Sequence, residues 1–196
     1  MDQSDRSSII QDGTLNVITA SRLVPWKRVD RLIRAVPAVM REVPNSRFVI
    51  VGDGAERSEL EALAQSMGVA NCITFTGSLP RRDVFALMRK SHVFVSTNDL
   101  SNVSRGLKEA MYLGLCIVTL DAGDTCSLVC DGVTGKLVTK DDTEALSSAL
   151  IEVLSQPDER ARLGHAASRF IREHEPSQEA VMRERIARLT DRKSVV

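Results

Sequence analysis

Short runs of β-branched residues alternate along this chain with longer segments of helical periodicity. Six apolar runs are predicted strands, at residues 15–20, 48–51, 73–75, 93–96, 116–120 and 136–138. Helical patterns follow them at residues 29–43, 55–67, 83–90, 104–113, 142–154 and 157–173. Repeated strand–helix units predict a parallel sheet with helices on both faces, and nearly continuous apolar strands are typical of such double coverage. The predicted fold class is α/β, a doubly wound Rossmann-like sheet.

The composition excludes several classes of protein. The 196 residues include 26 Lys and Arg against 26 Asp and Glu, a formal net charge of zero, with one Trp, one Tyr and five Phe. A general nucleic-acid-binding protein is normally basic and carries aromatic residues for base stacking, so we expect no nucleic-acid partner. The first residues lack the layout of a signal peptide, and no apolar run is as long as a membrane span. We therefore expect a cytoplasmic domain.

Cysteine and histidine residues do not form a metal signature. Cys126 and Cys130 are separated by three residues, and no second pair lies at the spacing of a zinc finger or ribbon. We expect no metal site, and thiols that stay reduced.

In a doubly wound sheet, ligands bind at the carboxyl ends of the strands, so the loops after the strands hold the candidate residues. The first such loop carries Arg22 and Lys27, which are five residues apart and can reach one anionic group. The alternative is that both are solvated loop cations.

Glycines follow the next two predicted strands. Gly52 and Gly54 open a helix after the second strand, and Gly77 follows the third. Their backbone can turn tightly and come close to a ligand. A nicotinamide-binding site would need a third glycine, where Arg57 stands, and an acid at the end of the second strand; neither appears.

The loop after the fourth strand runs from Thr97 into a helix that carries Glu109. Ser and Asn residues before this helix are good caps, and its first N–H groups form an anion site. The Glu109 carboxylate can accept from a sugar hydroxyl. Alternatively, it complements the helix dipole or pairs with Lys108 or Arg105.

Six motifs in order resemble the glycosyltransferase family-four (group 1) enzymes of GT-B architecture: ASRLVPWKRVDRLIRA, VIVGDG, ITFTG, VFVST, LKEAMYLGLCIVT and DGVTGKLV. The resemblance is to their C-terminal, nucleotide-sugar-binding half and spans roughly residues 14–190. It implies an N-terminal tail (1–13), a donor-binding domain (14–175), and a C-terminal helix and tail (176–196). It also implies that the N-terminal acceptor-binding domain is absent and acts as a partner in cis or in trans.

The same resemblance implies roles for individual residues. Arg22 and Lys27 would hold the donor diphosphate and stabilise its charge, and Glu109 would bind the donor ribose. The other implied donor-binding residues are Gly52, Gly54, Gly77, Ser78 and Leu79 around the base, and Asn102, Val103, Ser104, Arg105 and Gly106 near the phosphates. One departure matters: the family usually has a second glutamate eight positions before the first, where this chain has Ser101. Asp99 or Ser101 would then face the sugar.

The leading prediction is the donor-binding domain of a retaining glycosyltransferase. It would transfer a hexose from a UDP- or GDP-sugar to a glycan, lipid or other acceptor, with no cofactor besides the donor substrate. Peripheral association with the inner face of a membrane would come through the absent half, without which the chain would be inactive. Two alternatives stay open: a non-catalytic nucleotide-binding or assembly module, and a nucleotide-sugar epimerase with a similar cleft.

Overall fold

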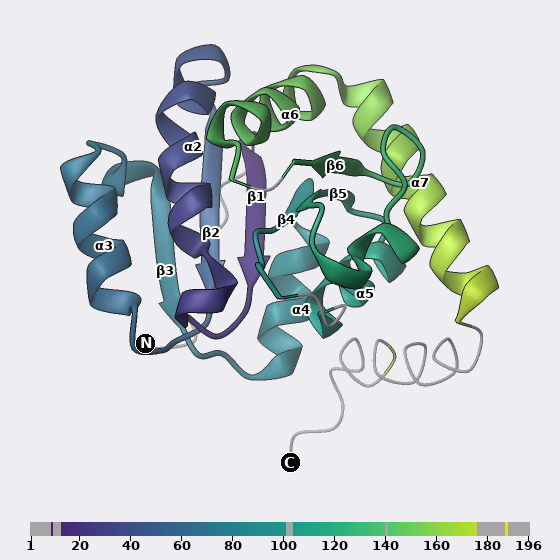
Figure 1. Cartoon of the computed structure of the whole chain (residues 1–196), viewed down its shortest axis with the longest axis horizontal. Coiled ribbons are helices and arrows are strands. Elements are labelled where there is room, and N and C mark those ends of the chain that lie inside the picture. The colour runs from purple at the N-terminus through teal and green to yellow at the C-terminus, as the bar shows by residue number, and fades with distance from the viewer. Residues whose placement is uncertain (1–8, 10–12, 101–103, 140, 176–186, 188–196) are drawn as a thin grey trace.

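A computed structural model describes residues 9, 13–100, 104–139, 141–175 and 187 of the chain. The described residues contain one six-stranded sheet (Figure 1), whose strands are β1 (Leu15–Ala20), β2 (Ser46–Val51), β3 (Ile73–Gly77), β4 (Val93–Ser96), β5 (Cys116–Leu120) and β6 (Lys136–Val138). Their spatial order is β3-β2-β1-β4-β5-β6, and every neighbouring pair is parallel. The predicted parallel α/β sheet is confirmed.

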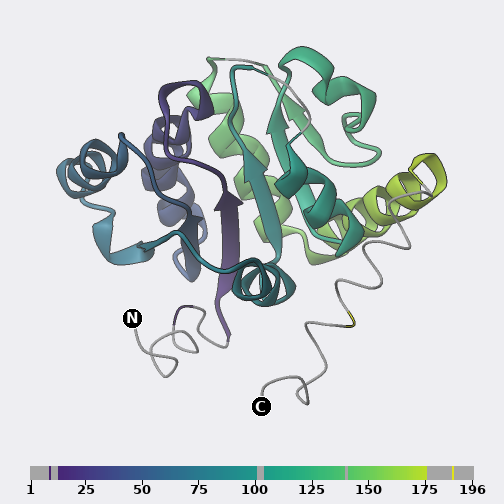
Figure 2. The same cartoon turned by 90° about the horizontal axis from the view of Figure 1, so that it is seen from below.

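Helices cover both faces of this sheet (Figures 1 and 2). They are α2 (Val29–Glu42), α3 (Arg57–Ser66), α4 (Arg81–Arg89), α5 (Arg105–Tyr112), α6 (Thr143–Ser155) and α7 (Pro157–His174), with short 3-10 turns at Pro25–Lys27, Ala70–Cys72 and Gly123–Ser127. Helices α2, α3 and α6 contribute to one hydrophobic core, and α4, α5 and the end of α7 to another. The doubly wound arrangement is therefore confirmed.

The two cores follow from the alternation of side chains along each strand. In β1, Val17 packs into the core under α2, whereas the next residue, Ile18, packs into the core under α4 and α5. Both side chains are fully buried. Burial on both faces favours apolar side chains on both sides of a strand, which explains why Val17 and Ile18 are adjacent apolar residues, although the strand also buries Asn16 and Thr19.

The strand order reverses between β1 and β4, and this reversal positions the site. From β1 the chain proceeds outward to β2 and β3, and then returns to place β4 on the other side of β1. The loops after β1 and β4 therefore leave the sheet in opposite directions. The crevice between them, at the carboxyl ends of the strands, is where doubly wound folds bind ligands.

Helix α7 packs against the sheet that the rest of the chain forms. It begins directly after α6 with Pro157 at its first position, where the missing N–H costs nothing. Its Ala167 and Ile171 pack in the same core as α5. The predicted C-terminal helix and tail at 176–196, the tail at 1–13 and loop residues 101–103 lie outside the described residues, apart from residues 9, 13 and 187.

Candidate functional site

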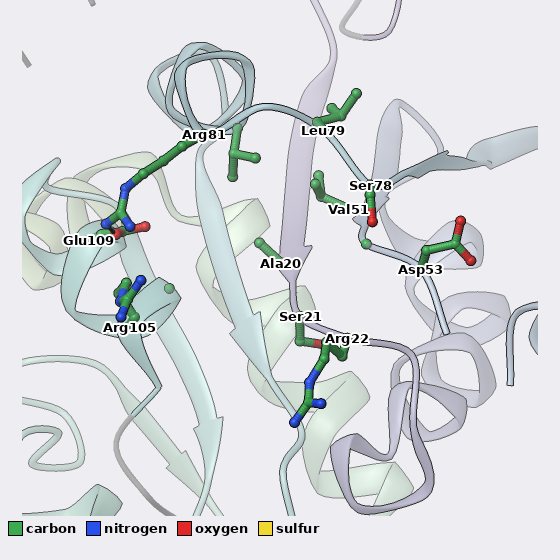
Figure 3. Close-up of a pocket in the computed structure, with 13 residues that line it drawn as sticks. Ala20, Ser21, Arg22, Val51, Asp53, Ser78, Leu79, Arg81, Arg105 and Glu109 are labelled. Carbon is green, nitrogen blue, oxygen red and sulfur yellow. Dashed lines mark ion pairs between the residues drawn. The ribbon is translucent and has the colours of Figure 1, made fainter. Parts of the chain in front are cut away.

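A cleft of about 330 Å³ opens at the carboxyl edge of the sheet, where β1, β2 and β3 end and α4 and α5 begin (Figure 3). It is lined by thirteen residues: Ala20, Ser21, Arg22, Val51, Gly52, Asp53, Ser78, Leu79, Arg81, Val84, Arg105, Gly106 and Glu109.

Sequence reasoning located about half of this lining. The cleft brings together seven of the predicted residues: Arg22, Gly52, Ser78, Leu79, Arg105, Gly106 and Glu109. Five others lie outside its lining: Lys27, Gly54, Gly77, Asp99 and Ser104. The remaining three, Ser101, Asn102 and Val103, lie outside the described residues.

The loop after β1 carries two cations close to one another. The Arg22 guanidinium lies over the Trp26 ring, 5.8 Å from its centroid. Burial, and then the positive charge of Arg22, lower the pKa of the Lys27 ammonium below its ordinary value. Neither cation forms an ion pair with the part of the chain that the structure describes. Two cations without carboxylate partners among the described residues, of which Arg22 lines the cleft, are suited to bind an anion.

Hydrogen bonds between main-chain atoms join the loop after β2 to the loop after β1. Leu23 N–H donates to Asp53 O over 2.9 Å, and Ser21 N–H to Val51 O over 3.0 Å. A Cβ on Gly52 would lie 1.8 Å from Ser21 O, and one on Gly54 would lie 2.2 Å from Leu23 O. The close approach that requires these glycines is therefore between the two loops, whereas the sequence suggested an approach to a ligand.

On the far side of the cleft, Asp53 is already paired. The Arg57 guanidinium contacts the Asp53 carboxylate at 3.2 Å and the Glu61 carboxylate at 2.8 Å. Gly77 lies beside this arginine, and Gly77 O accepts from Gly52 N–H over 3.0 Å. Asp53 thus shares the single positive charge of Arg57 with Glu61.

Helix α5 begins at the cleft wall. Ser104 is its N-cap, and Ser104 Oγ accepts from Leu107 N–H over 3.2 Å, so a predicted capping residue is confirmed. Arg105 is the first helical residue and is exposed. It makes no ion pair with a described residue. Its charge and the first N–H groups of the helix add to the positive potential of the cleft.

The Glu109 side chain, one turn further along α5, is only 7% exposed and forms an ion pair with Arg81 of α4. Lys108 pairs instead with Glu175, at the end of α7. The sequence had suggested Lys108 or Arg105 as the partner of Glu109. The structure shows Arg81 in that role instead. A signal for Arg81 existed: an arginine at the first position of a helix opposes the helix dipole, and so needs a reason to be there.

Asp99, after β4, is bound by two arginines at the start of α2, the N-cap residue Arg28 and Arg31 in the first turn. Its carboxylate lies 2.6 Å from Arg31 and 3.3 Å from Arg28, and its N–H donates to Trp26 O over 3.0 Å. Arg31 also pairs with Asp141, just before α6. Asp99 thus joins the loop after β4 to α2.

This geometry accompanies a clear match to a known family. The family model of group 1 glycosyl transferases matches residues 1–170 of the chain. The chain belongs to this family. Among curated relatives, a GDP-mannose-dependent alpha-(1-6)-phosphatidylinositol monomannoside mannosyltransferase of Mycolicibacterium smegmatis is 32% identical over 157 residues, covering 76% of this chain and 41% of the relative. A GDP-mannose-dependent monoacylated alpha-(1-6)-phosphatidylinositol monomannoside mannosyltransferase of Corynebacterium glutamicum is also 32% identical, over 91% of this chain and 47% of its own length.

Solved structures of glycosyltransferases share the fold. Anabaena Alr3699/HepE in complex with UDP matches with a TM-score of 0.77 and 25% identity, over 96% of this chain and 52% of that one. The C-terminal domain of a group 1 family protein (LpcC) from Francisella tularensis matches with a TM-score of 0.74 and 17% identity, over 83% and 86%. This group 1 chain spans less than half the length of the two curated relatives described above.

The described residues of this group 1 chain contain neither a cluster of metal-binding side chains nor a membrane-spanning helix. Within residues 13–100, 104–139 and 141–175, no three His, Cys, Asp or Glu side chains gather where they could hold a metal ion. None of the helices described there has the length and apolar character needed to cross a membrane.

Proposed function

We propose that the chain is the donor-binding half of a retaining group 1 glycosyltransferase, and that the 330 Å³ cleft holds a nucleoside diphosphate sugar. The observation that carries this proposal is the charge of the cleft. Glu109 and Asp53 are paired within the chain, whereas Arg22 and Arg105 have no ion pair among the described residues. The cleft therefore presents a net positive charge to an anion.

The proposed position of the diphosphate is between the loop after β1 and the start of α5. Arg22 approaches from the first of these elements, and Arg105 with the helix N–H groups from the second. Lys27 supports Arg22 from outside the lining. In sugar transfer, negative charge develops on the leaving diphosphate, and preorganised cations and N–H donors stabilise it without a metal ion.

The nucleoside is proposed to lie along the remainder of the cleft. Ser78 and Leu79, together with the backbone at Gly52, border the base, and Glu109 accepts from the ribose hydroxyls. The named donors of two relatives favour GDP-mannose, and the UDP bound by the Anabaena protein keeps a UDP-sugar as the second choice.

The acceptor is proposed to bind to another part of the enzyme, in cis or in trans. The chain covers 41% and 47% of the two mannosyltransferases, which leaves room in such enzymes for a second domain. Their names specify phosphatidylinositol mannosides, so a lipid acceptor and peripheral contact with a cytoplasmic membrane face through that second part fit this proposal.

Calorimetric titration with GDP, UDP and the corresponding nucleosides tests the proposal. A charge-assisted hydrogen bond contributes about 1.5–3 kcal/mol, so we expect Arg22→Ala and Lys27→Ala to weaken the diphosphate roughly ten- to a hundredfold and the nucleoside much less. Arg41→Ala is the control, because Arg41 lies in the last turn of α2, at the opposite edge of the sheet. Diphosphate binding that is unchanged in Lys27→Ala would contradict the assigned site.

A second candidate function is a nucleotide-binding module without catalysis. The observation that favours it is Ser101, which stands where the family usually has a glutamate. Addition of a family acceptor-binding domain and acceptor distinguishes the two: transfer supports the enzyme, and binding without transfer supports the module. Conversion of the sugar nucleotide in the absence of any acceptor would instead identify an epimerase.

A further inference from the structure

The pair formed by Arg81 and Glu109 is not explained by the sequence motifs. Arg81 is the first residue of α4, and Glu109 lies in α5, so the two side chains meet from separate helices on the same face of the sheet. Both line the cleft and form an ion pair, and Figure 3 shows them pointing toward each other, on the side of the cleft opposite Asp53 and Ser78.

Glu109 needs such a partner because it is buried. Its side chain is 7% exposed, and a carboxylate removed from water without a cation beside it is strongly disfavoured. Arg81 is the one cation that pairs with it among the described residues. The ion pair uses Glu109 Oε1, which leaves Oε2 to accept from another donor.

Arg81 is itself held in place. Its guanidinium lies 5.7 Å from the centroid of the Phe85 ring, one turn further along α4, and Phe85 is buried. The Arg81 side chain is 36% exposed, so the cation stands at the boundary between the core and the cleft. A planar guanidinium fixed on one side by an aromatic ring presents its N–H groups in a defined direction.

We propose that Arg81 is a positioning residue for the donor ribose. It holds the Glu109 carboxylate charged and oriented so that its free oxygen accepts from the 2′- and 3′-hydroxyls. This inference rests on the proposed function, because it assumes that a nucleoside diphosphate occupies the cleft. It adds a residue that acts through Glu109 and a mechanical link between α4 and α5 around the ligand.

The competing role for Arg81 is direct contact with a phosphate. The two roles differ in which part of the ligand they affect. A phosphate contact affects every diphosphate equally, whereas a residue that acts through Glu109 matters only when the ligand has ribose hydroxyls. Matched ligands with and without these hydroxyls therefore separate the two roles.

The experiment titrates the 196-residue chain with GDP and with 2′,3′-dideoxy-GDP, and repeats the series with the uridine pair. We expect Arg81→Met and Glu109→Gln each to weaken GDP about tenfold, and to leave the dideoxy ligand within twofold of the parent. The double variant should be little weaker than either single variant, since both remove the same contact. Arg82→Met is the control, because Arg82 is the neighbouring residue, is 53% exposed, pairs with Asp83 and does not line the cleft.

Three results would overturn the inference while leaving the proposed function in place. The first is an equal loss of affinity for GDP and for the dideoxy ligand in Arg81→Met. The second is a loss of GDP affinity in Glu109→Gln but not in Arg81→Met. The third is a double variant in which the two losses of affinity add. If the parent binds no diphosphate at all, the proposed function itself fails, and this inference fails with it. Should Arg81→Met not fold, Arg81→Lys keeps a charge without the planar fork, and we expect it to show the same dependence on the hydroxyls with a smaller loss.

Discussion

Arg31 shows how a single side chain can set the geometry of a loop that it does not belong to. It lies in the first turn of α2, is 5% exposed, and pairs with Asp99 after β4 and with Asp141 before α6. A buried guanidinium with two carboxylates fixes three segments relative to one another, because leaving any of these charges without a partner is unfavourable.

We expect Arg31→Met to lower the free energy of unfolding by about 1–3 kcal/mol, since Asp99 loses its 2.6 Å contact with Arg31 and Asp141 loses its contact with the same guanidinium. Arg34→Met is the matched control on the same helix. The Arg34 side chain is 52% exposed, and its contact with Asp30 is 3.8 Å long, so a change within about 0.5 kcal/mol is expected. Urea denaturation of both variants measures the difference, and equal stability of the two would refute the role of Arg31.

His92 gives the fold a dependence on pH. Burial, and then the positive charge of Arg160, lower the pKa of His92, and its Nδ1 accepts from Asn16 N–H over 3.0 Å. The folded pKa lies below the unfolded value of about 6.5, so the unfolded chain binds more protons between the two values. Stability should therefore fall as the pH falls below about 6.5. Urea midpoints at pH 7.5 and 5.5 measure this, and His92→Asn should reduce the difference; an unchanged pH dependence in that variant would assign the effect to other groups.

At the scale of elements, apolar patterning predicted the strands and helices well, and two of the small differences occur where polar residues begin an element. Helix α4 begins at Arg81, two residues before the predicted start, because Pro80 precedes it as the N-cap. Strand β2 begins at Ser46, two residues early, where the Ser46 hydroxyl donates to Val43 O. Polar residues at element ends are invisible to a search for apolar runs.

The site was predicted less completely, for a physical reason. Arg22 and Glu109 were found because each follows a strand, and parallel strands end at one edge of the sheet. The Arg81 pair depends on how two helices pack, and the place of Asp99 depends on Arg31, which lies 68 positions away in the chain. Motif spacing contains no information on either contact.

Helix α7 packs closely against the turn before β5, and the substitution Gly164→Ala tests how tight this packing is. A Cβ on Gly164 would lie 2.3 Å from Gly114 O, a backbone atom that cannot rotate away. Helix propensity alone favours Gly164→Ala by about 1 kcal/mol, but overpacking of this kind costs about 1–3 kcal/mol. We expect a net loss of stability in thermal unfolding. His165→Ala, on the exposed side of the same helix, should not be destabilised; greater stability of Gly164→Ala would show that the helix can shift.

At the scale of the whole molecule, the cleft touches both halves of the sheet. Its lining comes from β1, β2, the loops that follow them, the loop before α4, α4 and α5, so a bound ligand contacts segments that are distant in sequence. A ligand that contacts such segments only when they are assembled stabilises the folded chain as a unit.

We therefore expect GDP or UDP at a hundred times its dissociation constant to add about 2.7 kcal/mol to the stability of the chain, seen as a rise in melting temperature. The corresponding nucleosides, at equal concentration, should raise it less. We expect no sugar transfer by the 196 residues alone under the same conditions. Efficient transfer by this chain without a second domain would contradict the proposal that this chain binds the donor and another domain binds the acceptor.

The joined loops after β1 and β2 determine how this cleft can change over many substitutions. At Gly52 and Gly54 the contact surface consists of main-chain atoms, and even a methyl group would separate the loops. In a library of all single substitutions, variants changed at Gly52 or Gly54 should be depleted even when no ligand is used for selection. Variants changed at Ser78 or Leu79 should instead be enriched or depleted according to the ligand used for selection. Adaptation to a different donor should therefore occur through substitutions at Ser78 and Leu79, which line the cleft, whereas Gly52 and Gly54 should stay unchanged because they hold the two loops together.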